Sequence, residues 1–176
     1  MEQLQINWKR IGWVLGIVFF SIALDQYTKV LARTHLQGTL PKDYLDGFFR
    51  LTYVENTGAF LSLGSDLPGI LSVLLLKILP VGLLVGLLLY TLFHKEMNQW
   101  QYIAFSFISG GGISNIYDRL LYGEVTDFMM LSAFGLRTGI FNVADMSIML
   151  GLFLMLGKGL FQAKDKAAPQ ADADNT

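Results

Sequence analysis

Four apolar stretches set the first limit on how this chain can fold. They run over residues 11–32, 67–93, 100–116 and 140–161. A helix crosses a bilayer with about 20 mostly apolar residues, so each stretch is close to the required length. The apolar fraction of 53% also indicates a membrane protein. We predict an all-α membrane protein with four transmembrane helices in one domain over residues 1–166, followed by a disordered tail over residues 167–176.

Basic residues near the helix ends suggest the orientation. The side that holds both termini carries Lys9, Arg10, Lys95, Lys158, Lys164 and Lys166, and the other side carries Arg33, Lys42, Arg50, Arg119 and Arg137. This small difference favours both termini in the cytoplasm. The start of the first stretch also resembles a secretory signal. Since its helical pattern continues and further spans follow, we expect it to be retained.

Two connections then face outward. Residues 36–66 contain the aromatic and β-branched run 48–54, which predicts short β-structure on the membrane surface, followed by a turn at Asn56-Thr57-Gly58. Residues 121–139 mix polar and apolar side chains, as suits an interface. In the second stretch, Pro80 predicts a kink, and Lys77 is expected to extend toward the interface rather than to act in function.

The composition excludes several kinds of chemistry. There is no cysteine, and both histidines lie outside the apolar stretches. Disulfides, thiolate metal sites and a cysteine nucleophile are therefore absent, and neither a histidine base nor a histidine-rich metal site is expected. The net charge of −1 gives no reason to expect a nucleic-acid partner. We expect no metal and no cofactor.

Four aspartates lie in or against the apolar stretches: Asp25, Asp118, Asp127 and Asp145. A carboxylate near hydrocarbon costs about 2.5–3.5 kcal/mol at a helix centre, so it often marks a functional site. Asp127 and Asp145 can meet at the outer surface and share a proton, as a pair that activates water. The alternative is that each carboxylate is neutralised separately by Lys and Arg.

The neighbouring polar residues have predicted roles of their own. Asp25 and Lys29 are four residues apart and can form a local ion pair or can order a site. Asp118 is predicted to pair with Arg119, which could then hold substrate carbonyls or phosphate. Asn115 shares a face with Asp118, and Asn142 shares one with Asp145 or caps its helix. The glycines at 110–112 are interpreted as a close helix contact.

Five motifs resemble those of the lipoprotein signal peptidases (signal peptidase II) and follow in the same order along nearly the whole chain. They are Asp25-Gln-Tyr-Thr-Lys29, Glu55-Asn-Thr-Gly-Ala-Phe60, Ser114-Asn-Ile-Tyr-Asp-Arg119, Gly123-Glu-Val-Thr-Asp-Phe128 and Phe141-Asn-Val-Ala-Asp145. Each motif alone is weak, but their combination is specific. Two positions differ from the family pattern: an alanine is missing after Gly58, and Ser114 stands where glycine is common.

The resemblance implies a four-helix inner-membrane bundle with a small extracytoplasmic β-cradle and an extracytoplasmic loop. It implies an aspartyl endopeptidase that cuts diacylglyceryl-prolipoproteins before the lipidated cysteine. The implied catalytic pair is Asp127 and Asp145. The residues implied to line the substrate site or orient the pair are Asn56, Asn115, Arg119 and Asn142, with Asp25, Lys29, Asp118 and Gly58 in support.

The expected partners are the prolipoprotein substrate and membrane lipids, and the expected state is a monomer. The active site is expected at the outer interface of the bacterial inner membrane. Two other functions fit the apolar faces. A small proton-coupled transporter would need acids near the bilayer midplane on several helices, whereas these cluster toward one interface. A non-catalytic scaffold subunit would leave the converging acids unexplained.

Overall fold

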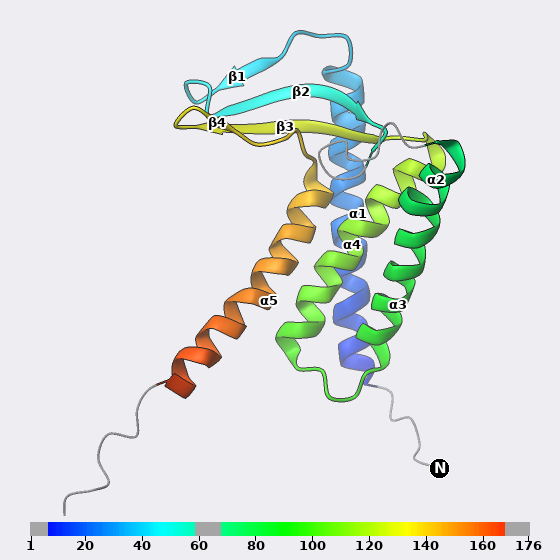
Figure 1. The fold of residues 1–176 in the computed structure, drawn as a ribbon, viewed down its shortest axis with the longest axis vertical. Coiled ribbons are helices and arrows are strands. Elements are labelled where there is room, and N and C mark those ends of the chain that lie inside the picture. The colour runs from blue at the N-terminus through cyan, green and yellow to red at the C-terminus, as the bar shows by residue number, and fades with distance from the viewer. Residues whose placement is uncertain (1–6, 59–67, 168–176) are drawn as a thin grey trace, which may run out of the picture.

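The computed structural model describes residues 7–58 and 68–167. Four helical columns carry a small antiparallel sheet at one end (Figure 1). The helix α1 starts at the end far from the sheet, and α5 runs away from the sheet toward that same far end. The predicted tail after residue 167 and the predicted outer region at 59–66 lie outside the described residues.

The first column is α1, Trp8–His35, which starts at Asn7, whose side chain accepts a hydrogen bond from the amide of Arg10. Its buried face repeats every three or four residues and contains Val14, Val18, Ser21, Asp25, Lys29 and Ala32. Its outer face carries large apolar side chains such as Phe19 and Phe20, which are 74% and 61% exposed. A helix with polar residues inside and apolar residues outside matches a lipid environment.

The second column consists of α2 (Gly69–Val73), η2 (Leu74–Ile78) and α3 (Leu79–Phe93) without interruption. The π-turn η2 ends at Ile78, two residues before Pro80, near the point where a kink was predicted. Because proline has no amide hydrogen, an α-helical bond from residue 80 to the carbonyl of Leu76 cannot form. The amide of Leu79 reaches back five residues to Leu74, so the wider turn accommodates the proline.

The third column is α4, Gln99–Leu121, and the fourth is α5, Val143–Ala167. Glycines bring α4 against its neighbours, as predicted. A Cβ atom on Gly110 would lie 2.7 Å from Ser21 Cβ on α1, and one on Gly111 would lie 2.3 Å from the carbonyl oxygen of Ala144 on α5. These distances leave no room for any side chain, so close helix packing explains the glycines.

The sheet contains β1 (Lys42–Tyr44), β2 (Phe49–Asn56), β3 (Val125–Ala133) and β4 (Leu136–Arg137), in the order β1-β2-β3-β4. All neighbouring strands are antiparallel. The strand predicted near residues 48–54 is confirmed as β2. The longer strand β3 was not predicted, because its first four residues are all buried and show no alternation of polar and apolar side chains.

The sheet packs on the C-terminal end of α1 through a small apolar core. Ala32 from α1 and Leu36, which caps this helix, form this core with Phe128 from β3. The register pairs Val54 with Asp127. This packing fixes the start of β3 above the helical bundle.

Length and hydropathy support a membrane crossing for two helical columns among the described residues, Trp8–His35 and Gly69–Phe93. The helices α4 and α5 occupy the sequence ranges of the third and fourth predicted spans. The helix α4 contains buried polar residues such as Ser106, Ser109 and Asn115. These residues lower its mean hydropathy. The prediction of four crossings therefore stays a prediction.

Candidate active site

Asp127 and Asp145 line the same pocket, which has a volume of about 430 Å³. Asp127 is the third residue of β3, and Asp145 lies in the first turn of α5. The short connection between β4 and α5 returns the chain beneath the sheet, where Phe141 bonds to Met129 of β3. This return brings the two acids from separate elements into one space.

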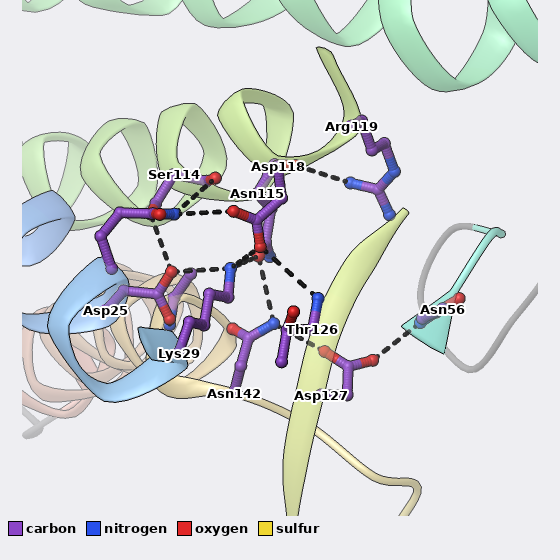
Figure 2. A network of polar contacts seen from close by, with 12 residues as sticks. Asp25, Lys29, Asn56, Ser114, Asn115, Asp118, Arg119, Thr126, Asp127 and Asn142 are labelled. Carbon is purple, nitrogen blue, oxygen red and sulfur yellow. Dashed lines mark hydrogen bonds and ion pairs between the residues drawn. The ribbon is translucent and has the colours of Figure 1, made fainter. Parts of the chain in front are cut away.

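The carboxylate of Asp127 accepts a hydrogen bond on each oxygen. Asn142 Nδ2 donates to Oδ1 at 2.7 Å, and Asn56 Nδ2 donates to Oδ2 at 2.8 Å (Figure 2). Burial raises the pKa of Asp127 to about 6, the Asn56 bond lowers it, and the nearby charge of Asp145 raises it. The residue can therefore exchange a proton near neutral pH, as acid–base catalysis requires.

Asp145 belongs to the start of its own helix. Its amide donates to Asn142 Oδ1 at 3.0 Å, and its Oδ2 accepts from the amide of Asn142 at 3.1 Å. This reciprocal arrangement is a capping box with aspartate in the third helical position. The other oxygen, Oδ1, accepts from Asn115 Nδ2 at 2.9 Å. Four hydrogen bonds thus orient the acids of the candidate pair.

Two asparagines connect the carboxylates to each other. Asn142 Nδ2 donates to both Asp127 Oδ1 and Asn115 Oδ1, the latter at 3.1 Å. Asn115 in turn donates to Asp145 and accepts from Lys29 Nζ at 2.8 Å. The predicted capping role of Asn142 is confirmed, and the residue also donates to Asp127.

Lys29 lies at the centre of a buried charge cluster. Its Nζ is 2.7 Å from Asp25 Oδ2 and 2.9 Å from Asp118 Oδ2, and all three side chains are fully buried. The predicted ion pair of Asp25 and Lys29 is confirmed. Asp25 also accepts from Ser114 Oγ and from the amide of Ala144 in the first turn of α5, each at 2.7 Å. The cluster thus joins α1, α4 and α5 directly beneath the acids.

The predicted pairing of Asp118 with Arg119 is wrong. Adjacent helical residues point in directions about 100° apart, so they do not share a face. Asp118 faces the interior, where it contacts Lys29 and Arg33. The Arg119 guanidinium lines the pocket and donates from Nη2 to the Gly58 carbonyl oxygen at 2.7 Å.

Gly58 is also held by Asn56, whose Oδ1 accepts from the Gly58 amide at 3.0 Å. This bond forms the predicted turn after β2. Asn56 therefore orients Asp127 with one end of its amide group and the turn with the other. The walls of the pocket opposite these polar groups are apolar and include Leu75, Leu76, Pro80, Ile140, Val125, Ile148, Met149 and Leu152.

Four residues of the network were not assigned to the site from the sequence: Gln26, Arg33, Ser114 and Thr126. Gln26 Nε2 donates to Ser114 Oγ and to Asp118 Oδ1, each at 2.9 Å. Arg33 has a signal in the sequence, because it continues the four-residue spacing of Asp25 and Lys29 on one face of α1. In the described part of the chain, no cluster of three or more His, Cys, Asp or Glu residues could hold a metal ion.

A family model described as signal peptidase (SPase) II matches residues 17–161. A lipoprotein signal peptidase of Chlorobium phaeobacteroides is 40% identical over 149 residues, covering 77% of this chain and 87% of that protein. One from Borrelia duttonii is 34% identical over 170 residues, covering 92% and 98%. A solved bacterial membrane enzyme superposes with a TM-score of 0.77 at 26% identity, covering 97% of this chain and 100% of that one.

Proposed function

The chain belongs to the signal peptidase II family, and on this premise we propose that it is an aspartic endopeptidase that matures lipoproteins. Membership makes it a peptidase that removes signal peptides from prolipoproteins. The finer proposal is that its substrate carries diacylglyceryl on a cysteine and that the bond before this cysteine is cut. Asp127 and Asp145 carry out the reaction, without a cofactor.

The observation that carries the proposal is that two hydrogen-bonded carboxylates line one pocket. One carboxylate, ionised, takes a proton from water, and the water oxygen bonds to the scissile carbonyl carbon. The second carboxyl, protonated, gives its proton to the carbonyl oxygen. The first then protonates the departing nitrogen as the C–N bond breaks, and the second recovers a proton from a hydroxyl of the intermediate. Both carboxyls thereby return to their starting states.

Arg119 and Asn56 would orient the substrate backbone. The Arg119 guanidinium lines the pocket that holds both acids, and its Nη2 already donates to the backbone carbonyl of Gly58. A guanidinium at this place can donate to a substrate carbonyl as well. The apolar wall formed by η2 and α5 suits a signal helix and acyl chains, which stay in the hydrocarbon while the bond to be cut reaches the acids.

The proposed topology places four crossings in the bacterial inner membrane, with both termini in the cytoplasm and the sheet and acids at the outer interface. The sheet and the first turn of α5 lie at the same end of the bundle, opposite to the start of α1 (Figure 1). Asp127 belongs to β3 and Asp145 to that first turn. Water can then reach the acids from the outer side. We propose a monomer, since the two carboxylates and the residues that orient them belong to a single chain.

The test is incubation of the purified protein with a lipidated prolipoprotein and with the same protein lacking the lipid. We expect a single cut before the modified cysteine in the lipidated form alone. Equal cutting of both forms would remove the lipid from the proposed specificity. A lack of cutting in either form, with the protein folded, would remove the proposed activity.

A further inference from the structure

Arg33 is a charged residue near the site that the proposed reaction does not use. It lies in the last turn of α1, and its side chain is 22% exposed. Its Nε donates to Thr126 Oγ1 at 2.9 Å, and its Nη2 lies 3.4 Å from Asp118 Oδ1. The guanidinium carbon lies 4.2 Å from the centre of the Tyr122 ring, within the range of a cation–π contact.

These three partners lie on both sides of one tight turn. The helix α4 ends at Leu121, with Tyr122 as its C-terminal cap. Gly123 then adopts a φ of +84°, a conformation that favours glycine, and β3 begins at Val125. Arg33 therefore reaches from α1 to the residue before the turn and to the second residue of the strand after it.

Thr126 is held at two of its atoms. Its hydroxyl accepts from Arg33, and its amide donates to Asp118 Oδ2 at 3.5 Å. The side chain of Thr126 points to the side of β3 opposite to that of Asp127, because successive residues of a strand alternate. Fixing Thr126 therefore fixes the backbone from which Asp127 projects toward Asn56 and Asn142.

We infer that Arg33 is a positioning residue, which clamps the turn between α4 and β3 through Tyr122, Thr126 and Asp118 and so sets the orientation of the Asp127 carboxylate. The inference rests on the proposed function for its effect on activity. Its structural part does not depend on that function.

Neutralisation of Asp118 accounts for only part of this geometry. Lys29 lies closer to Asp118, at 2.9 Å, but it shares its single charge between Asp25 and Asp118, so Arg33 supplies the second positive charge of the cluster. Arg33→Lys keeps this charge and therefore separates its effect from that of the other contacts. The contact with the Thr126 hydroxyl and the ring of Tyr122 needs the flat guanidinium, which a lysine ammonium does not replace.

The test compares Arg33→Met, Arg33→Lys and Thr126→Val. We expect Arg33→Met to lower kcat by about tenfold to a hundredfold, since a small misplacement of a catalytic group has effects of this size. KM should stay unchanged, because Arg33 does not line the pocket. Arg33→Lys should recover less than half of the loss. Arg50→Met is the control, because it removes an arginine of β2 whose ion pair, with exposed Asp43, does not involve the turn between α4 and β3.

A double-mutant cycle tests the route of the effect. If Arg33 acts through Thr126, the variant with both Arg33→Met and Thr126→Val should be no slower than Arg33→Met alone. Multiplied effects on kcat would show that the two residues act separately and would overturn the clamp. Unchanged kcat in folded Arg33→Met would overturn it as well.

Hydrogen exchange separates this inference from the proposed function. In Arg33→Met, backbone amides of residues 123–128 should exchange at least tenfold faster than in the parent protein, while those of α3 stay unchanged. Unaltered exchange at 123–128 would refute the clamp. If the parent protein cuts no lipidated substrate, the proposed function fails, while the exchange experiment still decides whether Arg33 holds the turn.

Discussion

Asn142 and Asp145 bond to each other in both directions, with the Asn142 side chain accepting from the Asp145 amide at 3.0 Å and the Asp145 side chain accepting from the Asn142 amide at 3.1 Å. One acid of the proposed catalytic pair is thus part of the N-terminal cap of α5. Its position is set by the first turn of a helix, which is a rigid support for a catalytic group.

Replacing Asn142 by alanine should separate capping from catalysis. The variant loses a helix cap, which costs about 1 kcal/mol, and also loses the bond to Asp127. We expect the cleavage rate to fall by about a hundredfold, a loss typical of a misplaced catalytic group. Asn98→Ala is the matched control, because Asn98 forms a capping box at the start of α4. It should lower the melting temperature similarly and leave cleavage intact. Similar cleavage by both variants would show that the Asp127 contact does not matter.

Replacing either Asp127 or Asp145 by asparagine should abolish cleavage of a lipidated prolipoprotein. Acid–base groups contribute about 10²- to 10⁴-fold to rate, and the loss should reach at least this range. Asp43→Asn is the control, because Asp43 lies on β1 and bonds to Arg50 outside the pocket. Retention of normal rates by either dyad variant, measured by the release of the signal peptide, would remove that residue from the mechanism.

Folding stability should depend on pH through Asp127. Burial raises its pKa from 3.8 to about 6, so between these values the folded state binds more protons than the unfolded state. Stability from this group is therefore full below about pH 4 and is lost as the pH rises through about 6. The loss is on the order of 2–3 kcal/mol, from about 1.4 kcal/mol per pKa unit.

The measurement is the melting temperature of the parent protein and of Asp127→Asn at pH 4.5 and pH 7.5. The parent should lose more stability than the variant on going to the higher pH. Asp43 should have the opposite effect on the pH dependence of stability. Its bond to Arg50 lowers its pKa, so its contribution to stability is lost as the pH falls. The same pH dependence in parent and Asp127→Asn would contradict the buried, titrating state of Asp127.

Lys29→Met should strongly destabilise the fold. It leaves Asp25 and Asp118 buried without their central cation, and breaking a buried ion pair costs about 3–5 kcal/mol. Adding Asp118→Asn should recover part of the melting temperature by removing one unpaired charge. Cleavage should stay low in both variants, because Asn115 has lost the donor that orients it. A fully active Lys29→Met would show that the charge cluster does not support the acids.

Gly111→Ala should displace the first turn of α5. The added methyl group would lie 2.3 Å from the carbonyl oxygen of Ala144, the residue before Asp145. Overpacking costs about 1–3 kcal/mol, and a shifted Asp145 should lower the cleavage rate as well. Gly86→Ala is the control, because nothing lies within 4 Å of the added atom. Equal melting temperatures and rates for the two variants would mean that α4 and α5 are not in such close contact.

The helices and the second strand could be predicted from the sequence because their signals are local. Apolar length indicates the helical columns, and β-branched and aromatic residues indicate β2. The strand β3 has no such signal, since its pairing with β2 joins Val54 to Asp127, residues far apart in the chain. Its burial on both faces also removes the alternation that marks a half-exposed strand.

The acids of the site were predicted to meet, and they do line one pocket; their catalytic role stays a prediction. The partner of Asp118 was predicted wrongly, because adjacency in sequence was taken for adjacency in space. The true partners, Lys29 and Arg33, come from another helix. Contacts between helices depend on how the helices pack, which the spacing within one helix does not determine.

The π-turn at Leu74–Ile78 has a consequence for how the pocket can change during evolution. It places Leu75, Leu76 and Pro80 on the pocket wall. A π-turn contains one residue more than an α-helical turn, and the extra residue is accommodated within the turn itself. Deleting one codon there would restore α-helical spacing and remove one side chain from the pocket wall, while the helices on either side keep the faces that they present. The shape of the pocket can thus change without a change in how α3 packs on α4.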